Sequence, residues 1–415
     1  MKKKVFFKTF GCRTNLYDSQ VMMSSMKEYE ITQNEDEADT IVINSCTVTN
    51  GADTHVRTYI SQIEKTTGAK IFLTGCGAHT KGESLLAEKR VHGVFGQSEK
   101  QKIDFLLSKE QPFYDAGDLN HIDNVIVDDF VGKSRAFIKI QEGCNFRCSY
   151  CIIPYVRGDA RSTNEEKILQ QVSRLAINGF GEFILTGTNV GSYGVGEGTS
   201  IAKLMKKMSQ IRGVRRIRLG SVEPIQITDE FKELLDEPWL ERHLHIALQH
   251  TSPAMLKLMN RRNVYKQDRE LFEHLASKGF AIGTDFITGH PGETQSLWDE
   301  AMINARALPL THLHAFSYSK RDNTPSATMK PEINGKIAKE RLHELEAIID
   351  EKNLYFRKTN KEPLEVLVES TKDGMYQGFD QFFNKIIIKS NDDLVGNWIN
   401  IEDYEAQKEF NYVRI

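Results

Sequence analysis

The stretch AFIKIQEGCNFRCSYCIIPYVRG, residues 136–158, places three cysteines directly after an expected strand. Cys144, Cys148 and Cys151 have the spacing Cys-x3-Cys-x2-Cys. A structural zinc site usually takes four ligands from two short Cys/His pairs, and the sequence offers no second close pair. Thiolates in one short loop also suit an iron–sulfur cluster. The loop therefore indicates a metal centre with one open position, with zinc as the alternative.

The chain around this loop alternates strand and helix signals from residue 135 onward. The expected strands are AFIKIQEG, GEFILTG, RRIRLGSV, HLHIALQ, FAIGTDFITG and THLHAFSYS. Amphipathic segments such as NEEKILQQVSRLAING lie between them and favour helices. Six β/α units predict a partial (β/α)6 barrel over residues 130–360, with its chemistry at the carboxyl ends of the strands. The tight cysteine loop follows the first of these strands.

The first part of the chain, residues 1–111, predicts a separate doubly wound parallel α/β domain. Its strands read KKVFFKTF, TIVINS, KIFLTG and VHGVFG, with helical segments between them. Cys12, Cys46 and Cys76 each stand just past one of these strands. Carboxyl ends of parallel strands share one sheet edge, so we expect the three thiols to converge. Three separate buried cysteines are the plainer alternative.

The remaining segments are shorter. Residues 112–130 are polar and turn-rich and are interpreted as a linker. After Pro363 the pattern changes to short strands separated by Gly, Asp and Asn turns: LEVLVES, MYQGFD, NKIIIKS, VGNWINIE and NYVRI. This pattern predicts a small five-stranded antiparallel β-barrel over residues 361–415.

Composition places the chain in an ordinary class. It has 415 residues, of which 40% are hydrophobic and 27% charged, and its net charge is −3. A nucleic-acid partner would therefore have to be held by local basic patches. No apolar run approaches the ~20 residues of a membrane span, and no secretory leader is seen. We expect a cytoplasmic enzyme without a membrane partner. In such a protein, six cysteines favour metal binding or catalysis over disulfide bonds.

These motifs resemble the radical S-adenosylmethionine (SAM) methylthiotransferases over nearly the whole chain. The matching stretches are KTFGCRTNLYDSQ, INSCTVTN, TGC, KIQEGCNFRCSYCIIPYVRG, ILTGTNVGSYG, LGSVEP, LQHTSPAMLKLMNRR, TGHPGET and the C-terminal barrel, which is TRAM-like. The resemblance implies two [4Fe-4S] clusters. Cys144, Cys148 and Cys151 would hold the radical SAM cluster, and Cys12, Cys46 and Cys76 an auxiliary one. A non-catalytic iron–sulfur or zinc scaffold remains the alternative.

The resemblance also implies a mechanism. An electron from the first cluster cleaves SAM and yields a 5′-deoxyadenosyl radical, while the auxiliary cluster holds sulfur already methylated by another SAM. Tyr150 would lie near the adenine of SAM. Asn189, Glu223 and Gln249 end expected barrel strands, so we expect them to bind the cofactor. The implied partners are tRNA and an electron donor of the flavodoxin or ferredoxin type, and we expect a monomer.

Family substrates are tRNA adenosines beside the anticodon or an aspartate of a ribosomal protein. CTVTN, LTGTNVGSYG, RLGSVEP and YSKRDNTPSA resemble the branch that converts N6-threonylcarbamoyladenosine (t6A) at tRNA position 37 to 2-methylthio-t6A. Isopentenyladenosine tRNA and the aspartate remain alternatives. Several cations flank the cysteine loop or lie in the motifs MNRRN and YSKRD, and we expect them to meet RNA phosphates: Arg157, Arg161, Arg261, Arg262, Lys320 and Arg321.

Overall fold

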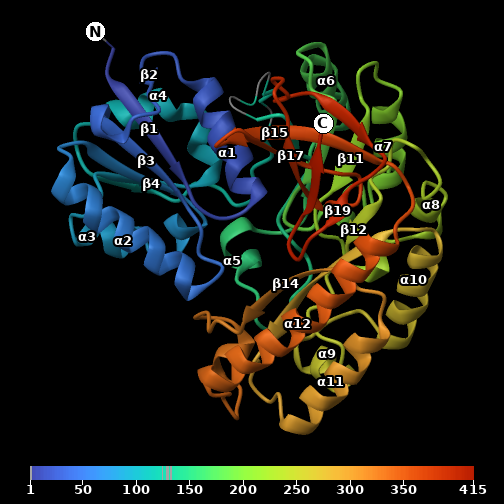
Figure 1. Cartoon of the computed structure of the whole chain (residues 1–415). Helices are drawn as coiled ribbons and strands as arrows, with labels where there is room; N and C mark the ends of the chain where they lie inside the picture. Colours follow the sequence, from blue (N-terminus) through green and yellow to red (C-terminus); the bar gives the residue numbers. More distant parts are fainter. Residues whose placement is uncertain (1, 124, 128–129, 131–132) are drawn as a thin grey trace.

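The computed structural model describes residues 2–123, 125–127, 130 and 133–415. Figure 1 shows the N-terminal sheet with its helices beside a curved array of strands and helices, and the C-terminal strands lying against that array. The three parts match the predicted α/β architecture. The helix α5 (Ile153–Arg157), which follows the tight cysteine loop, lies between the first two of them.

The N-terminal sheet has the strand order β2-β1-β3-β4-β5-β6, and its pairs are parallel. Its strands are β1 (Lys4–Thr9), β2 (Glu30–Ile31), β3 (Thr40–Ser45), β4 (Lys70–Gly75), β5 (Gly93–Phe95) and β6 (Phe113–Asp115). The connecting elements are α1 (Arg13–Ser25), η1 (Glu35–Glu37), α2 (Asn50–Thr66), η2 (Cys76–His79), α3 (Gly82–Ala87), η3 (Gln97–Lys102) and α4 (Ile103–Ser108). The doubly wound prediction is confirmed.

Alternate side chains along these strands pack into two hydrophobic cores, one on each face of the sheet. Ile41 and Ile43 pack with α2 on one face, while Val42 and Phe72 pack with α1 and α4 on the other. Both faces of the central strands are therefore covered by helices, which explains why TIVINS is an uninterrupted buried run.

The expected linker over residues 112–130 is corrected at its start. Phe113–Asp115 forms β6, the last strand of the N-terminal sheet, and pairs in parallel with β5. A three-residue strand in a polar stretch carries too little periodicity to be recognised in the sequence. Residues 116–123, 125–127 and 130 form no strand or helix. Residues 124 and 128–129 lie outside the described residues.

The central part is a curved array of six parallel strands. They are β7 (Ala136–Lys139), β10 (Glu182–Thr186), β11 (Arg216–Leu219), β12 (His243–His245), β13 (Ala281–Thr288) and β14 (His312–Ser317). They pair as β7-β10-β11 and β12-β13-β14, and the parallel bridges Ile217↔Leu240 and Val222↔Ile246 join the two groups. Within the described ranges no ladder joins β7 to β14. The partial barrel is confirmed.

Helices cover the outside of this barrel. They are α6 (Glu165–Ile177), α7 (Ile201–Ser209), α8 (Asp229–Lys232), α9 (Pro253–Leu258), α10 (Tyr265–Ser277), α11 (Gln295–Ala307) and α12 (Gly335–Thr359), with η4 (Val190–Ser192), η5 (Pro224–Gln226) and η6 (Pro325–Thr328). One large apolar core joins them to the strands. Beside the barrel, β8 (Gln141–Glu142) pairs with β9 (Arg161–Ser162). No helix in the described part of the chain has the length and hydropathy of a membrane span.

The C-terminal sheet curls over its own core and has the order β18-β15-β16-β17-β20-β19. Its strands are β15 (Leu364–Lys372), β16 (Met375–Phe379), β17 (Lys385–Lys389), β18 (Trp398–Ile401), β19 (Glu405–Ala406) and β20 (Asn411–Arg414). It has one strand more than the five expected, and β17 and β20 pair in parallel whereas the other pairs are antiparallel. It is therefore a half-barrel and not a wholly antiparallel one.

Candidate active site

The tight cysteine loop leaves the barrel at the end of β7 and β8 and is fixed by backbone contacts. Gly143 has φ +73°, and a side chain there would lie 1.9 Å from the carbonyl oxygen of Asp159. This close approach requires glycine. The backbone N–H of Cys144 donates to the carbonyl of Gly158 at 3.0 Å. The two ends of the loop are thus held together, and the three thiols are presented from one turn.

Amide groups hold the first thiol of the loop. The Nδ2 of Asn189 donates to Sγ of Cys144 at 3.5 Å, and its Oδ1 accepts from Nε2 of Gln226 at 2.7 Å. The Oε1 of Gln226 accepts from the backbone N–H of Glu223 at 2.9 Å. Asn189 and Glu223, both expected at the cofactor, therefore belong to one hydrogen-bonded chain that begins at Cys144.

This chain continues to the second thiol. Glu223 accepts from Nη1 of Arg261 at 2.9 Å, and the same Nη1 lies 3.5 Å from Sγ of Cys148. Burial raises the pKa of Glu223, whereas Arg261 opposes that rise. Tyr150 lies close to Arg261 and Cys148, and burial raises the pKa of its hydroxyl well above its usual value. Gln249 lies past the end of β12, in an isolated parallel bridge to Phe286, and has a left-handed backbone with φ +67°, a strained conformation typical of functional loops.

The N-terminal cysteines lie at the carboxyl ends of the adjacent strands β1, β3 and β4, as their positions predicted. Gly11 has φ +99°, and a side chain on it would lie 3.1 Å from Sγ of Cys46, so only glycine leaves that thiol room. Burial raises the pKa of the Cys76 thiol to about 11, and Cys12 and Cys46 add to this rise. The three sulfurs are thus close enough to interact electrostatically.

Arg157 connects this second site to Glu142, which precedes the tight cysteine loop. Its guanidinium is buried and donates from Nε to Sγ of Cys76 at 3.2 Å and from Nη2 to Oδ1 of Asn15 at 2.5 Å. Its Nη1 donates to Asp18 at 2.8 Å and to Glu142 at 2.6 Å. The α5 residues around it pack on Cys76 in a small apolar cluster. The helix that ends the tight loop therefore forms one wall of the N-terminal cysteine site.

Two buried lysines complete the charges around Arg157. Lys139 contacts Asp18 at 2.7 Å and Asp123 at 2.5 Å, and Lys100 contacts the same two carboxylates at 3.0 and 2.5 Å. Although burial alone raises the pKa of Asp18, the lysines and Arg157 outweigh burial and hold this pKa well below its usual range. These opposite charges balance one another, so the group acts as a structural ion cluster joining α1 to β7.

The cysteines fit clusters better than single ions. All six are free thiols. Sulfurs on one zinc ion, each bound at about 2.3 Å, lie roughly 4 Å apart. Within the described residues, the groups whose ligand atoms all lie within 4.8 Å contain His, Asp and Glu but no cysteine. Three thiols spread over a wider site, with donors such as Asn189 and Arg261 beside the sulfurs, suit a multi-iron cluster.

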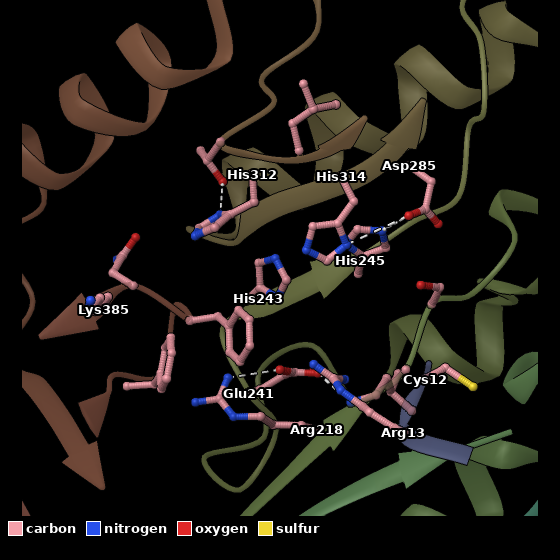
Figure 2. Close-up of a pocket in the computed structure, with 18 of the residues that line it drawn as sticks. Cys12, Arg13, Arg218, Glu241, His243, His245, Asp285, His312, His314 and Lys385 are labelled. Atoms are coloured by element: carbon pink, nitrogen blue, oxygen red, sulfur yellow. Dashed lines mark hydrogen bonds and ion pairs between the residues drawn. The ribbon is translucent and has the colours of Figure 1, made fainter. Parts of the chain in front are cut away.

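A cavity of about 1050 Å³ opens between the three parts of the chain. Cys12 and Arg13 line it from the N-terminal sheet, residues 186–188 from the end of β10, and Phe379, Phe383 and Lys385 from the C-terminal sheet. Figure 2 shows Cys12 and Arg13 at one side of this cavity and the barrel strands across from them. The auxiliary cysteine site and the barrel interior thus face a common space.

Four histidines from two strands face this cavity, and none of them is among the predicted site residues. They are His243 and His245 of β12 and His312 and His314 of β14 (Figure 2). Gly283 of β13 lies between them in register, and a side chain there would lie 2.7 Å from the ring of His243. His245 Nε2 contacts Oδ1 of Asp285 at 3.1 Å. The alternating HLH in both strands was a readable sign of one polar face.

The six cations expected at RNA phosphates do not form one surface. Arg157 and Arg261 are held at the thiols, and Arg321 is buried in an ion pair of 2.6 Å with Asp53. Arg161 is half-buried and donates to backbone carbonyls, including that of His121 at 2.5 Å. Exposed side chains remain at Arg262, which lies over the Phe146 ring, and at Lys320.

Comparisons with known proteins agree with this geometry. Residues 138–302 match the model of the radical SAM superfamily, and residues 4–96 match that of the uncharacterized protein family UPF0004. The radical SAM methyltransferase TsrM from Kitasatospora setae has a similar fold, with a TM-score of 0.61 and 15% sequence identity over 79% of this chain and 77% of its own. Residues 138–302 therefore carry the radical SAM domain.

Sequence relatives define the family. A Helicobacter pylori (strain J99) protein, provisionally named a methylthiotransferase, is 52% identical over 99% of both chains. The threonylcarbamoyladenosine tRNA methylthiotransferase MtaB of Bacillus subtilis is 33% identical over 99% of this chain and 96% of its own. A tRNA-2-methylthio-N(6)-dimethylallyladenosine synthase of Acetivibrio thermocellus is 30% identical over 96% and 88%. The chain belongs to the radical SAM methylthiotransferases, transferases of a methylthio group that use SAM and two [4Fe-4S] clusters.

Proposed function

We propose that this enzyme converts t6A next to the tRNA anticodon to 2-methylthio-t6A. The observation that carries the proposal is the shared cavity, because Cys12 of one cysteine site and the strand ends above the other line the same space. A substrate carbon placed there would lie between Cys12 and the end of β10, where Thr188 contacts Gly143 beside the tight cysteine loop. The similarity to MtaB of Bacillus subtilis over nearly the full chain supports the t6A substrate.

We assign the cofactor-holding residues as the resemblance implied. Cys144, Cys148 and Cys151 would hold the radical SAM cluster, and Cys12, Cys46 and Cys76 the auxiliary one. When bound, these groups supply one-electron cleavage of SAM and the sulfur for insertion. Asn189 and Arg261 donate toward the thiols and so stabilise their charged form. Tyr150 and Glu223 lie beside this site through Arg261, and we expect them and Gln249 to contact SAM.

The polar lining of the cavity favours t6A over isopentenyladenosine. Arg13 and four histidines face the space where the N6 substituent would lie. An apolar isopentenyl chain would remove these groups from water without offering them hydrogen bonds, which costs free energy. The threonylcarbamoyl group carries a carboxylate, a hydroxyl and amide groups that can pair with them. Among the six expected cations, Arg262 and Lys320 keep exposed heads for tRNA phosphates.

Reconstituted enzyme, given SAM and a reductant, tests the proposal on matched tRNAs. One tRNA carries t6A at position 37, a second isopentenyladenosine, and a third unmodified adenosine, while an aspartate-containing ribosomal-protein peptide covers the remaining family substrate. We expect 2-methylthio-t6A from the first tRNA and at least about tenfold less product from the others. Preferential methylthiolation of isopentenyladenosine or of the peptide would show that the substrate is wrong.

A further inference from the structure

Arg13 is a guanidinium without a carboxylate partner in the cavity. Within the described residues no carboxylate oxygen lies within 4.0 Å of it, and it donates no side-chain hydrogen bond. Its cationic neighbours differ in this respect. Arg135 is paired with Glu369 at 2.5 Å, and Arg218 with Glu182 and Glu241 at 2.7 and 3.0 Å. Arg13 is thus the guanidinium of this group that is left free to bind a ligand.

The surroundings of Arg13 favour an anion. Its side chain is partly buried and lies near the cations Arg135 and Arg218, while the nearby carboxylates of Glu182 and Glu241 are already paired with Arg218. A desolvated guanidinium beside other cations is costly while it stands alone, and binding of an anion removes that cost. One face of the site is the ring of Phe383, whose centroid lies 5.8 Å from the guanidinium carbon.

The backbone conformation of Phe383 and two ring contacts fix its side chain beside Arg13. It has φ +64°, a left-handed backbone that is strained for a residue with a large side chain. Its ring stacks on His243 at 5.4 Å and on Phe379 at 4.9 Å. The turn after β16 therefore inserts an aromatic wall into the cavity opposite Arg13, and the subsite is formed by two distant parts of the chain.

Arg13 lies close to the cysteine site that would supply the sulfur. It directly follows Cys12, the proposed auxiliary ligand that lines the same cavity (Figure 2). In adenine, C2 and C6 flank the ring nitrogen N1, so the substituent on N6 lies on the same edge as the carbon that receives sulfur. A residue that binds the end of this substituent must therefore lie close to the auxiliary site, as Arg13 does.

We infer that Arg13 binds the carboxylate of the threonylcarbamoyl group and so selects the anionic substrate. This inference rests on the proposed function. A planar carboxylate can accept two parallel hydrogen bonds from a guanidinium, which a lysine ammonium offers less well. The site lies within the cavity beside the reacting edge of the base. A contact to a backbone phosphate is the other anionic possibility, and the experiment separates the two.

The test compares tRNA carrying t6A with the same tRNA in which the threonyl carboxylate is a methyl ester. For the wild-type enzyme we expect kcat/KM to favour the acid roughly 10- to 100-fold, the range of a charge-assisted hydrogen bond. In Arg13→Gln this ratio should fall toward one, mainly through a higher KM for the acid. Arg13→Lys should keep part of the preference. Iron content and thermal unfolding show whether each variant is folded and loaded.

Lys408→Gln is the matched control, because Lys408 is an exposed cation at the edge of the same cavity. It should leave the acid-to-ester ratio at its wild-type value. A ratio that Arg13→Gln leaves unchanged, or that Lys408→Gln lowers equally, overturns the inference while the proposed function stands. A phosphate contact would give the first of these results, because both tRNAs have the same phosphates. If the wild-type enzyme makes no methylthio product from either tRNA, the proposed function fails and the inference with it.

Discussion

Arg157 donates a hydrogen bond from Nε to Sγ of Cys76 over 3.2 Å, although 81 residues separate them. Arg157 closes the helix that follows the tight cysteine loop, and Cys76 opens η2 in the N-terminal sheet. The segment that follows the tight cysteine loop is therefore in direct contact with the N-terminal cysteine site through one buried side chain. This contact gives the two sites a fixed relative position, which a reaction that uses both requires.

Replacing Arg157 by methionine should destabilise the enzyme. The substitution keeps the apolar volume but leaves Asp18 and Glu142 with less positive charge, and loss of a buried ionic partner costs about 3–5 kcal/mol. Urea unfolding measures this loss. Arg269→Met is the control, because Arg269 forms an exposed pair with Glu273 on α10, and it should cost less than about 1 kcal/mol. Equal effects in the two variants would contradict the structural role of Arg157.

Removing one cysteine from each site should impair different steps of the reaction. We expect Cys148→Ala to abolish all turnover, because the radical SAM site cannot form. Cys46→Ala should spare reductive cleavage of SAM but lose sulfur insertion. Detection of 5′-deoxyadenosine alongside methylthio product measures both steps. Equal loss of SAM cleavage in the two variants would contradict this division of labour.

Metal content distinguishes an enzyme from a scaffold. Protein purified without oxygen should carry about four irons per cysteine triplet and little zinc. Chelation of the iron should then remove activity. One zinc ion per triplet, with no iron, would instead support the zinc reading of the cysteine loop.

The positions of the cysteines could be predicted from where each strand ends in the sequence. The side chains that contact the cysteines could not be predicted in this way. A cysteine placed just past a strand of a parallel sheet must lie at the ligand-binding edge, so both triplets could be located from the strand pattern. Whether an arginine is solvated or buried depends on residues far away in the chain. Arg157 meets Asp18 across 139 positions, and nothing in YVRG indicates this. For the same reason the contact between Arg13 and Phe383, which lie near opposite ends of the chain, could not be predicted.

The Glu223–Arg261 pair should be needed for the radical SAM site. Glu223→Gln keeps the size of the side chain but weakens its hold on Arg261, which lies beside Cys148. We expect SAM cleavage to fall roughly 10- to 100-fold, the effect typical of a lost ligand-orienting contact. Glu233→Gln, on the surface at the end of α8, serves as control and should have no effect. Unchanged cleavage in Glu223→Gln would show that Arg261 is positioned without this carboxylate.

Acid should destabilise the enzyme through the buried ion cluster. Burial opposes ionisation of Asp18, Asp123 and Glu142, but Lys100, Lys139 and Arg157 together hold their pKa values below the usual ones. The unfolded chain therefore binds more protons than the folded one in acid, so stability is present above the unfolded pKa of about 4 and is lost as pH falls below it.

Asp18→Asn should remove one of these groups and flatten this dependence. The slope of the unfolding free energy against pH should fall by up to about 1.4 kcal/mol per pH unit. Urea unfolding at several pH values between roughly 2.5 and 5 measures it, because the unfolded carboxyl takes up its proton in this range. A slope identical to that of the wild type would show that Asp18 keeps its ordinary pKa in the folded protein.

Nucleoside mass spectrometry of tRNA from a strain lacking this gene tests the central claim most directly. The account predicts that 2-methylthio-t6A disappears while t6A accumulates, and that the wild-type gene restores it but the Cys46→Ala and Cys148→Ala variants do not. Persistence of 2-methylthio-t6A at its normal level in the deletion strain would contradict the proposed function.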